Sequence, residues 1–479
     1  MTLGKAIENK YRSFFYDGPD SRDIAFARIF FYSSLIYLYF SDDYLIRYLY
    51  LPEIPTTLWR PISFFQGISH DGLMQLCSPL MVTLFGVSLL FSALGLLFPL
   101  MSFLAFLSGL FIIGMPNNIG TVYDSTTLVC VVLGILPFTH ASHSLSLDRH
   151  FGIKFKFNRL LNRSILERDH SVEQDHLSSV WGLNLIASLV FLYFLCSAIQ
   201  KMRLGGLRWP MSQDFAMALI YNQVELGKAL SQEFELHFIL KVMTLVLQFC
   251  AFVPLFWKKY RVFYTFLLLG FHLGVDSLMG VHFSTFKIIY FFIFPWTQFL
   301  RDLKKSVPFI PIFTRGKSLL MDPPNPWAES SWPLRRSSQI LHLSLLIFVL
   351  GGSLASVYTY KHFWPFSTAT MYAYPETFPY NEINFYIGDH AQQMTLVQDP
   401  DFFPLDRVRT QLAVRKLYFK DQVSLFSLGF AVTQMLTKAK KKPFKRLEIR
   451  QCYYPNIGAL KENYPYSEDC KLLQKIENH

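Results

Sequence analysis

One apolar segment, residues 177–209, constrains the fold of this chain more than any other. Its first part, 177–200, is long enough to cross a bilayer, because a helix rises about 1.5 Å per residue and needs roughly 20 residues to span the hydrocarbon. The segment then places Lys201 at the membrane edge, followed by two glycines and Trp209. An ammonium at this position either extends to the interface or loses its proton and serves as a base. The segment therefore predicts a membrane protein and leaves two roles open for Lys201.

The composition of the whole chain is that of an integral membrane protein. Apolar residues make up 52% of the 479 and charged residues 16%, whereas a soluble domain has about 25% charged residues. The net charge of +11 comes largely from short basic loops between apolar runs, so membrane topology explains it better than nucleic-acid binding. Residues 1–23 contain no apolar core and do not have the pattern of a cleavable signal peptide.

The apolar runs predict an all-α polytopic membrane bundle of about nine transmembrane helices. The fourth and eighth runs are short, which leaves a re-entrant path open for either. With nine spans, the most basic loops all fall on the cytoplasmic side, and this agreement is the main support for the count. The predicted spans lie at about 24–41, 75–97, 99–116, 121–138, 177–200, 234–257, 261–281, 283–297 and 338–357.

This topology divides the chain into a membrane region and one sizeable exported piece. The C-terminal residues contain alternating runs at 411–420 and 444–451, which are typical of strands, and a helical pattern at 423–438. We therefore expect a small α+β soluble domain outside the membrane. The predicted parts are a cytoplasmic N-terminal tail (1–23), a transmembrane domain (24–300), a cytoplasmic basic and Pro-rich loop (301–337), a last transmembrane helix (338–357) and the exported domain (358–479).

The exported domain contains only two cysteines, Cys452 and Cys470. An exported domain meets an oxidising compartment, so we predict that they form a disulfide; two unrelated free thiols are the alternative. The other four cysteines lie inside predicted spans, where a thiol behaves as a small apolar side chain.

Several polar residues lie within or beside the predicted spans. His272 and Asp276 are four residues apart and share a helix face, so they either border a functional cavity or form a structural pair. Asn117 and Asn118 end the third span and either turn the chain or donate hydrogen bonds to a ligand. The topology puts Asn117, Asn118 and Asp276, together with Lys201 and His282, toward the outer leaflet. No spacing typical of a metal site occurs, so we predict no metal.

The order of several short motifs over about residues 20–300 resembles the horizontally transferred transmembrane (HTTM) family, which includes the membrane region of vitamin K-dependent gamma-glutamyl carboxylase. Each motif is short, so their order carries the resemblance. The motifs are Ala27–Phe31, Pro116–Asn118, Leu136–Phe138 running on to Ser146–Asp148, Ala198–Lys201 with Gly206 and Trp209, and Phe271–Gly274.

The resemblance implies a role for Lys201 and a class of cofactor. In the carboxylase a lysine at this position deprotonates vitamin K hydroquinone, and oxygen converts the quinol into an alkoxide that removes a proton from a peptide glutamate; carbon dioxide then traps the carbanion. Such a base must be a neutral amine, so its pKa must lie well below about 10.4. The resemblance also implies an active site that opens to the exported side.

The chain departs from the family at one position that bears on the reaction. The carboxylase carries a histidine after its paired asparagines, and here that position is Ile119, which has no donor. The resemblance therefore favours the base and the quinone pocket more than glutamate carboxylation.

These observations predict a membrane enzyme of the carbon–carbon lyase or epoxidase type that acts on a reduced quinone or a similar lipid-soluble substrate. Lys201 is the predicted base, and the predicted pocket residues are Asn117, Asn118, Trp209, His272 and Asp276. The alternative is a non-catalytic membrane scaffold whose exported tail recruits a protein or peptide partner. A transporter is disfavoured by the lack of a repeat between the two halves.

Overall fold

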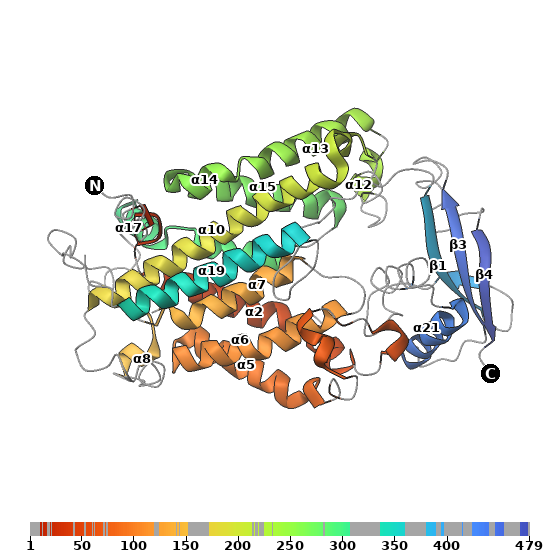
Figure 1. The fold of residues 1–479 in the computed structure, drawn as a ribbon, viewed down its shortest axis with the longest axis horizontal. Helices are drawn as coiled ribbons and strands as arrows, with labels where there is room; N and C mark the ends of the chain where they lie inside the picture. Colours follow the sequence, from red (N-terminus) through yellow and green to blue (C-terminus); the bar gives the residue numbers. More distant parts are fainter. Residues whose placement is uncertain are drawn as a thin grey trace.

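The computed structural model describes residues 10–118, 124–151, 172–306, 336–359, 380–388, 394–396, 414, 424–439, 446–454 and 470–477, with shorter gaps inside several of these ranges. In this structure a bundle of helices is followed, at one end, by a small sheet with its own helix (Figure 1). The N-terminus lies at one end of the bundle and the C-terminus beyond the other end.

Nine helical elements account for most of the bundle, and shorter helices connect them. The larger elements are α2 (Asp23–Ser41), α5 (Pro79–Leu94), α6 (Phe98–Gly114), α7 (Asp124–Ile135), α10 (Val172–Gly205), α13 (Phe234–Phe249), α15 (Arg261–Met279), α17 (Trp296–Ser306) and α19 (Arg336–Thr359). The shorter ones are α3 (Tyr44–Leu49), η2 (Thr56–Leu58), η3 (Ser63–Gly67), η4 (Met115–Asn118), η5 (Leu136–Phe138), α8 (Leu147–His150), η6 (Gly206–Met211), α12 (Glu225–Leu230), α14 (Phe252–Phe256), η7 (Lys258–Tyr260), α16 (Ser284–Lys287) and η8 (Ile288–Phe292).

Among the described residues, five segments are long and apolar enough to cross a membrane: 23–40, 98–118, 179–211, 235–256 and 258–279. Three further predicted spans correspond to shorter apolar helices at 79–94, 126–138 and 340–356. The predicted span at 283–297 is not a single helix, because its residues form the short elements α16 and η8. Phe286, Ile289 and Tyr290 are buried there by protein, so the apolar character of this segment reflects the core of the bundle.

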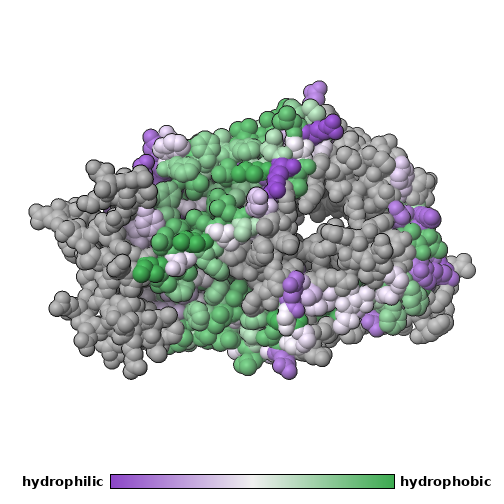
Figure 2. All heavy atoms as spheres, in the orientation of Figure 1, coloured by the Kyte–Doolittle hydropathy of each residue, from purple (hydrophilic) through white to green (hydrophobic). Residues whose placement is uncertain are grey.

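The outward faces of α13, α14 and α15 are strongly apolar. Met243 is 61% exposed, Phe256 63% and Phe263 64%. Figure 2 shows hydrophobic side chains covering much of the described surface of the bundle. A soluble monomer rarely exposes so large a contiguous apolar surface, whereas lipid tails cover it in a membrane. The described part of the chain therefore has the character of an integral membrane protein.

The C-terminal part forms an antiparallel four-stranded sheet in the order β2-β1-β3-β4, with α21 (Leu425–Ala439) on one face. The strands are β1 (Tyr380–Gly388), β2 (Met394–Leu396), β3 (Arg446–Tyr454) and β4 (Cys470–Glu477). Leu428 and Val432 of α21 are buried in a core with Leu447 and Ile449 of β3, whose two-residue spacing directs both toward the helix.

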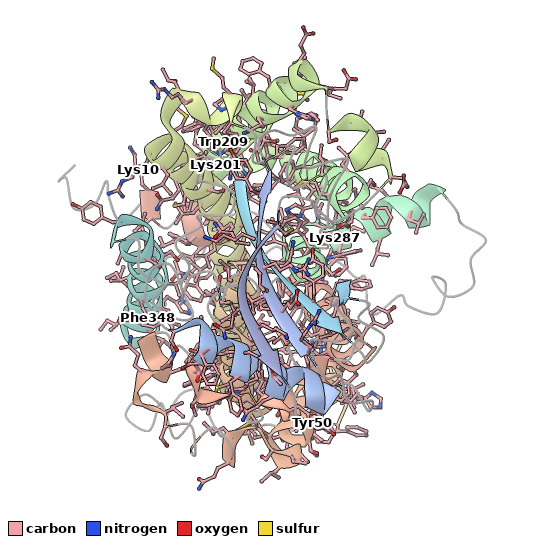
Figure 3. The ribbon with its side chains drawn as sticks, turned by 90° about the vertical axis from the view of Figure 1, so that its right-hand side faces the viewer. Lys10, Tyr50, Lys201, Trp209, Lys287 and Phe348 are labelled. Carbon is pink, nitrogen blue, oxygen red and sulfur yellow. A yellow bond between two sulfur atoms is a disulfide. The ribbon has the colours of Figure 1, made fainter. Side chains whose placement is uncertain are left out.

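The structure confirms the predicted helix at 423–438 and the predicted strand at 444–451 as α21 and β3. The predicted strand at 411–420 lies outside the described residues except for Val414, which is helical and buried. The α+β character of the domain is thus confirmed. Seen along the bundle, the sheet lies in front of the end that carries Lys201 and Trp209 (Figure 3).

The predicted disulfide is present between Cys452 of β3 and Cys470 of β4, which are paired residues of the sheet. The two cysteines are 18 positions apart in sequence. Closing a loop of this size stabilises the folded state by about 3 kcal/mol in the chain-entropy model. We expect Cys452→Ser with Cys470→Ser to lower the unfolding temperature of the C-terminal domain, followed by circular dichroism.

A non-reducing proteolytic digest provides the direct check on this disulfide. Mass spectrometry should find the peptides containing Cys452 and Cys470 joined, and separate after reduction. Two free thiols in the unreduced protein would contradict the pairing.

Candidate functional site

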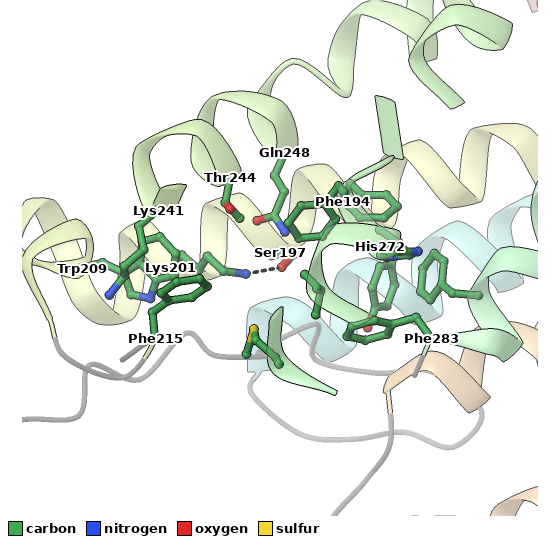
Figure 4. A pocket seen from close by; sticks show the side chains of 15 residues that line it. Phe194, Ser197, Lys201, Trp209, Phe215, Lys241, Thr244, Gln248, His272 and Phe283 are labelled. Atoms are coloured by element: carbon green, nitrogen blue, oxygen red, sulfur yellow. Dashed lines mark hydrogen bonds between the residues drawn. The ribbon is translucent and has the colours of Figure 1, made fainter. Parts of the chain in front are cut away.

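A cavity lies between α10, α13 and α15, at the end of the bundle where α10 finishes (Figure 4). Its volume, taken as the space open to the centres of water-sized groups, is about 80 Å³. One water needs about 10–15 Å³ on this measure, so the cavity has room for several heavy atoms. Aromatic rings dominate its wall, and the lining residues are Tyr193, Phe194, Ser197, Lys201, Trp209, Phe215, Lys241, Thr244, Gln248, Phe271, His272, Val275, Met279, Phe283 and Phe286.

Helical periodicity explains why polar residues meet in this apolar region. On α10 the lining residues Phe194, Ser197 and Lys201 recur at the i, i+3, i+7 spacing that keeps side chains on one helix face. Lys241, Thr244 and Gln248 have the same spacing on α13. In a membrane helix, polar side chains face the protein interior or a cavity rather than lipid. The two polar faces therefore converge on one space.

Lys201 lies in the cavity wall, and its side chain is nearly inaccessible to solvent. The residue is 3% exposed, and Nζ donates a hydrogen bond of 2.7 Å to Ser197 Oγ, one helical turn earlier. Nζ also lies 5.6 Å from the centroid of the Trp209 ring, within the range of a cation–π contact. The side chain does not extend into bulk solvent, so the interfacial role that the sequence left open for Lys201 is not the one seen here.

Trp209 is positioned by the turn that follows α10. Gly206 has a φ of +58°, which glycine adopts without strain, and it starts the 3-10 helix η6 that carries Trp209. At Gly205 a Cβ atom would lie 2.7 Å from the Cβ of Trp209. The two glycines thus let the chain turn tightly and bring the indole against the end of its own helix.

A second lysine approaches the same indole from α13. Lys241 is 1% exposed, and its Nζ lies 4.5 Å from the centroid of the Trp209 ring. It donates hydrogen bonds to the carbonyl oxygen of Ser212 at 3.0 Å and to Ser212 Oγ at 2.5 Å. The sequence prediction did not include Lys241 among the pocket residues, although the polar face that it shares with Thr244 and Gln248 was an available signal.

His272 lies at the other end of the cavity, within a cluster of aromatic rings. Its imidazole stacks on Phe283 with ring centroids 4.8 Å apart, and Phe194 and Phe286 pack around it. Its Nδ1 is 3.4 Å from the hydroxyl oxygen of Tyr290 on η8. The broken segment after α15 therefore builds this wall of the cavity, which explains why Phe283, Phe286 and Tyr290 are buried.

Asp276 does not line the cavity. Its carboxylate forms an ion pair with Lys287 of α16, which links the end of α15 to the segment that returns through the bundle. The hydrogen bond of His272 goes to Tyr290 instead. Of the two alternatives that the sequence left open for Asp276, the structure therefore shows a structural pair, but with Lys287 as the partner.

Asn117 and Asn118 lie in η4 and do not line the cavity either. The Asn117 amide donates to the carbonyl oxygen of Ile113 at 3.0 Å, and the Asn118 amide donates to those of Gly114 and Met115 at 3.1 Å each. Both side chains thus bind carbonyl groups left over at the end of α6, as helix termini require. The next position, Ile119, lies outside the described residues.

The predicted site residues Lys201, Trp209 and His272 thus border one cavity, together with Lys241, Thr244 and Gln248, which the sequence prediction did not include. Comparison with known protein families, curated proteins and solved structures found no match to this chain.

Proposed function

We propose that this protein is an integral membrane enzyme that binds a reduced quinone or a similar ring-shaped, lipid-soluble substrate, with Lys201 as the base. The observation that carries the proposal is the position of Lys201 Nζ in the wall of a cavity lined by aromatic rings, near the end of a long apolar helix. A planar ring guest can stack on such walls, since aromatic pairs are favourable at centroid separations of about 4.5–7 Å.

An amine in this environment is suited to proton abstraction. Burial among apolar groups disfavours the charged form of an amine, and only a neutral amine can accept a proton. The phenolic hydroxyl of a quinol is a weak acid that a neutral lysine can deprotonate. The bond that breaks is the quinol O–H, and the proton passes to Lys201 Nζ. The resulting quinolate is the electron-rich species that reacts with oxygen in the family that the sequence resembles.

Carboxylation of a peptide glutamate is not included in the proposal. The resemblance assigns that half-reaction to a histidine that is Ile119 here. In addition, Asn117 and Asn118 bind carbonyl groups at the end of α6 and do not line the cavity. The proposed activity is therefore deprotonation and oxidation of the quinol.

The proposed topology has nine membrane passes with the C-terminal domain outside. Lys258 Nζ binds the carbonyl oxygen of Ser13, and the amide of Thr297 binds Asp23. The chain therefore leaves the N-terminal end of the bundle along α15 and has returned to that end by Thr297. The return uses the short elements α16 and η8, a broken path that a membrane tolerates when protein surrounds it. Basic residues near the N-terminus place that end in the cytoplasm.

Native mass spectrometry of the protein purified in mild detergent tests the function. We expect a bound quinone, or uptake of one that is added. Val275→Trp fills the cavity wall and should abolish the adduct, whereas Leu273→Trp should retain it, because Leu273 is 50% exposed on the same helix. A wild-type protein that carries only phospholipid, or nothing, after quinone is added would favour the non-catalytic scaffold.

A further inference from the structure

Gln248 is a buried polar residue of the cavity wall with an unused hydrogen-bond acceptor. The residue is 5% exposed, and within the described part of the chain its Oε1 has no hydrogen-bond partner. Figure 4 shows its amide extending from α13 toward the side of the cavity formed by Ser197 and Lys201. A buried acceptor without a donor costs free energy, so a ligand that brings a donor to this place is favoured.

Thr244, one turn earlier on the same face, likewise favours a ligand that brings a hydrogen-bond donor. Its hydroxyl donates to the carbonyl oxygen of Leu240 at 2.8 Å. A hydroxyl has one hydrogen to donate, so Thr244 Oγ1 can offer a ligand only its lone pairs. Gln248 Oε1 and Thr244 Oγ1 therefore provide two hydrogen-bond acceptors on the α13 wall of the cavity.

We infer that Gln248, assisted by Thr244, receives an O–H of the bound ring and thereby selects the reduced quinol over the oxidised quinone. This inference rests on the proposed function, and it assigns the preference for the reduced ring to residues of α13. A quinol carries two O–H donors, whereas a quinone carries only carbonyl acceptors. With one hydroxyl directed to Lys201, the other is available to the α13 wall. A quinone at the same place would put its carbonyl oxygen against Gln248 Oε1 and leave both acceptors unsatisfied.

The test compares the affinities of a methylated 1,4-naphthohydroquinone and its quinone for the full-length protein, the hydroquinone being kept reduced under anaerobic conditions. We expect wild type to bind the hydroquinone about tenfold more tightly, since leaving a buried acceptor unsatisfied weakens binding by a factor of roughly 5 to 150. Gln248→Met keeps the side-chain length and removes the acceptor, so it should bring the ratio close to one by weakening hydroquinone binding. Thr244→Val should lower the ratio by a smaller factor.

Gln200→Met is the matched control, because Gln200 is a buried glutamine of α10 that does not line the cavity. It should leave the tenfold ratio unchanged. If Gln248→Met retains the wild-type ratio, the role of Gln248 is overturned while ring binding stands. The same holds if wild type prefers the quinone, which would mean that Gln248 presents its NH2 group to the ligand as a donor. If wild type binds neither form, the proposed function fails and this inference fails with it.

Discussion

Lys201→Ala is expected to lower quinol-dependent turnover by about 10²- to 10⁴-fold, the usual contribution of a positioned general base. Lys201→Arg should be equally impaired, because a guanidinium stays charged and cannot accept a proton. The measurement is oxygen-dependent oxidation of the naphthohydroquinone by purified protein, corrected for the uncatalysed rate. Both variants should still bind the cavity ligand detectably, since the aromatic wall is unchanged.

The matched control is Lys259→Ala. Lys259 is an exposed lysine that lies against Tyr260 in η7, directly before α15, whereas the lining residues of α15 lie in its second half. Turnover should remain at the wild-type level in this variant. A fully active Lys201→Arg variant would contradict the assignment of Lys201 as the base. The unfolding temperature of each variant shows whether a loss of turnover is due to a loss of folded structure.

Asp148→Ala is expected to destabilise the membrane region by about 3–5 kcal/mol, because it removes the charged acceptor of two amide hydrogen bonds, each worth about 1.5–3 kcal/mol. The carboxylate of Asp148 accepts hydrogen bonds from the amides of Leu97 and Phe98, at 2.8 and 3.1 Å. These amides start α6 and would be left without an acceptor. Arg28, which is fully buried, would also lose the nearby negative charge of Asp148.

Backbone strain at the same place adds to the expected effect. Leu97 and Leu145 have positive φ angles of 49° and 51°, a conformation that costs a branched residue about 1–3 kcal/mol. The carboxylate of Asp148 accepts a hydrogen bond from the amide of Leu97, and Arg28 Nη2 donates one to the carbonyl oxygen of Leu145 at 2.5 Å. Without the carboxylate, the connection from α5 to α6 loses the hydrogen bond that stabilises the positive φ angle of Leu97.

Unfolding by sodium dodecyl sulfate in mixed micelles measures the change. Asp148→Asn keeps one acceptor oxygen and should lose less stability than Asp148→Ala. Asp302→Ala, an exposed position of α17, should change the free energy of unfolding by less than about 0.5 kcal/mol. An Asp148→Ala protein as stable as wild type would show that the carboxylate does not hold α6.

The location of the cavity could be predicted from the sequence, but much of its lining could not. Lys201 and Trp209 lie near the end of the apolar segment 179–211, so their position along it depends only on helix length. Asn117, Asn118 and Asp276 were assigned to the pocket because they lie in the same leaflet. The depth of a residue in the membrane does not specify the direction of its side chain. Asn117 and Asn118 bind the end of α6 instead, and Asp276 binds Lys287.

The sequence by itself determined the properties that depend on short stretches of chain: apolar helices of membrane-spanning length, a lysine at the end of one of them, the α+β tail and its pair of cysteines. Only the tertiary structure decided that Thr244 and Gln248 face Lys201 across a cavity and that residues 284–292 return through the bundle in two short pieces. The physical reason is that periodicity defines a polar face on each helix, whereas the packing of neighbouring helices decides what that face meets.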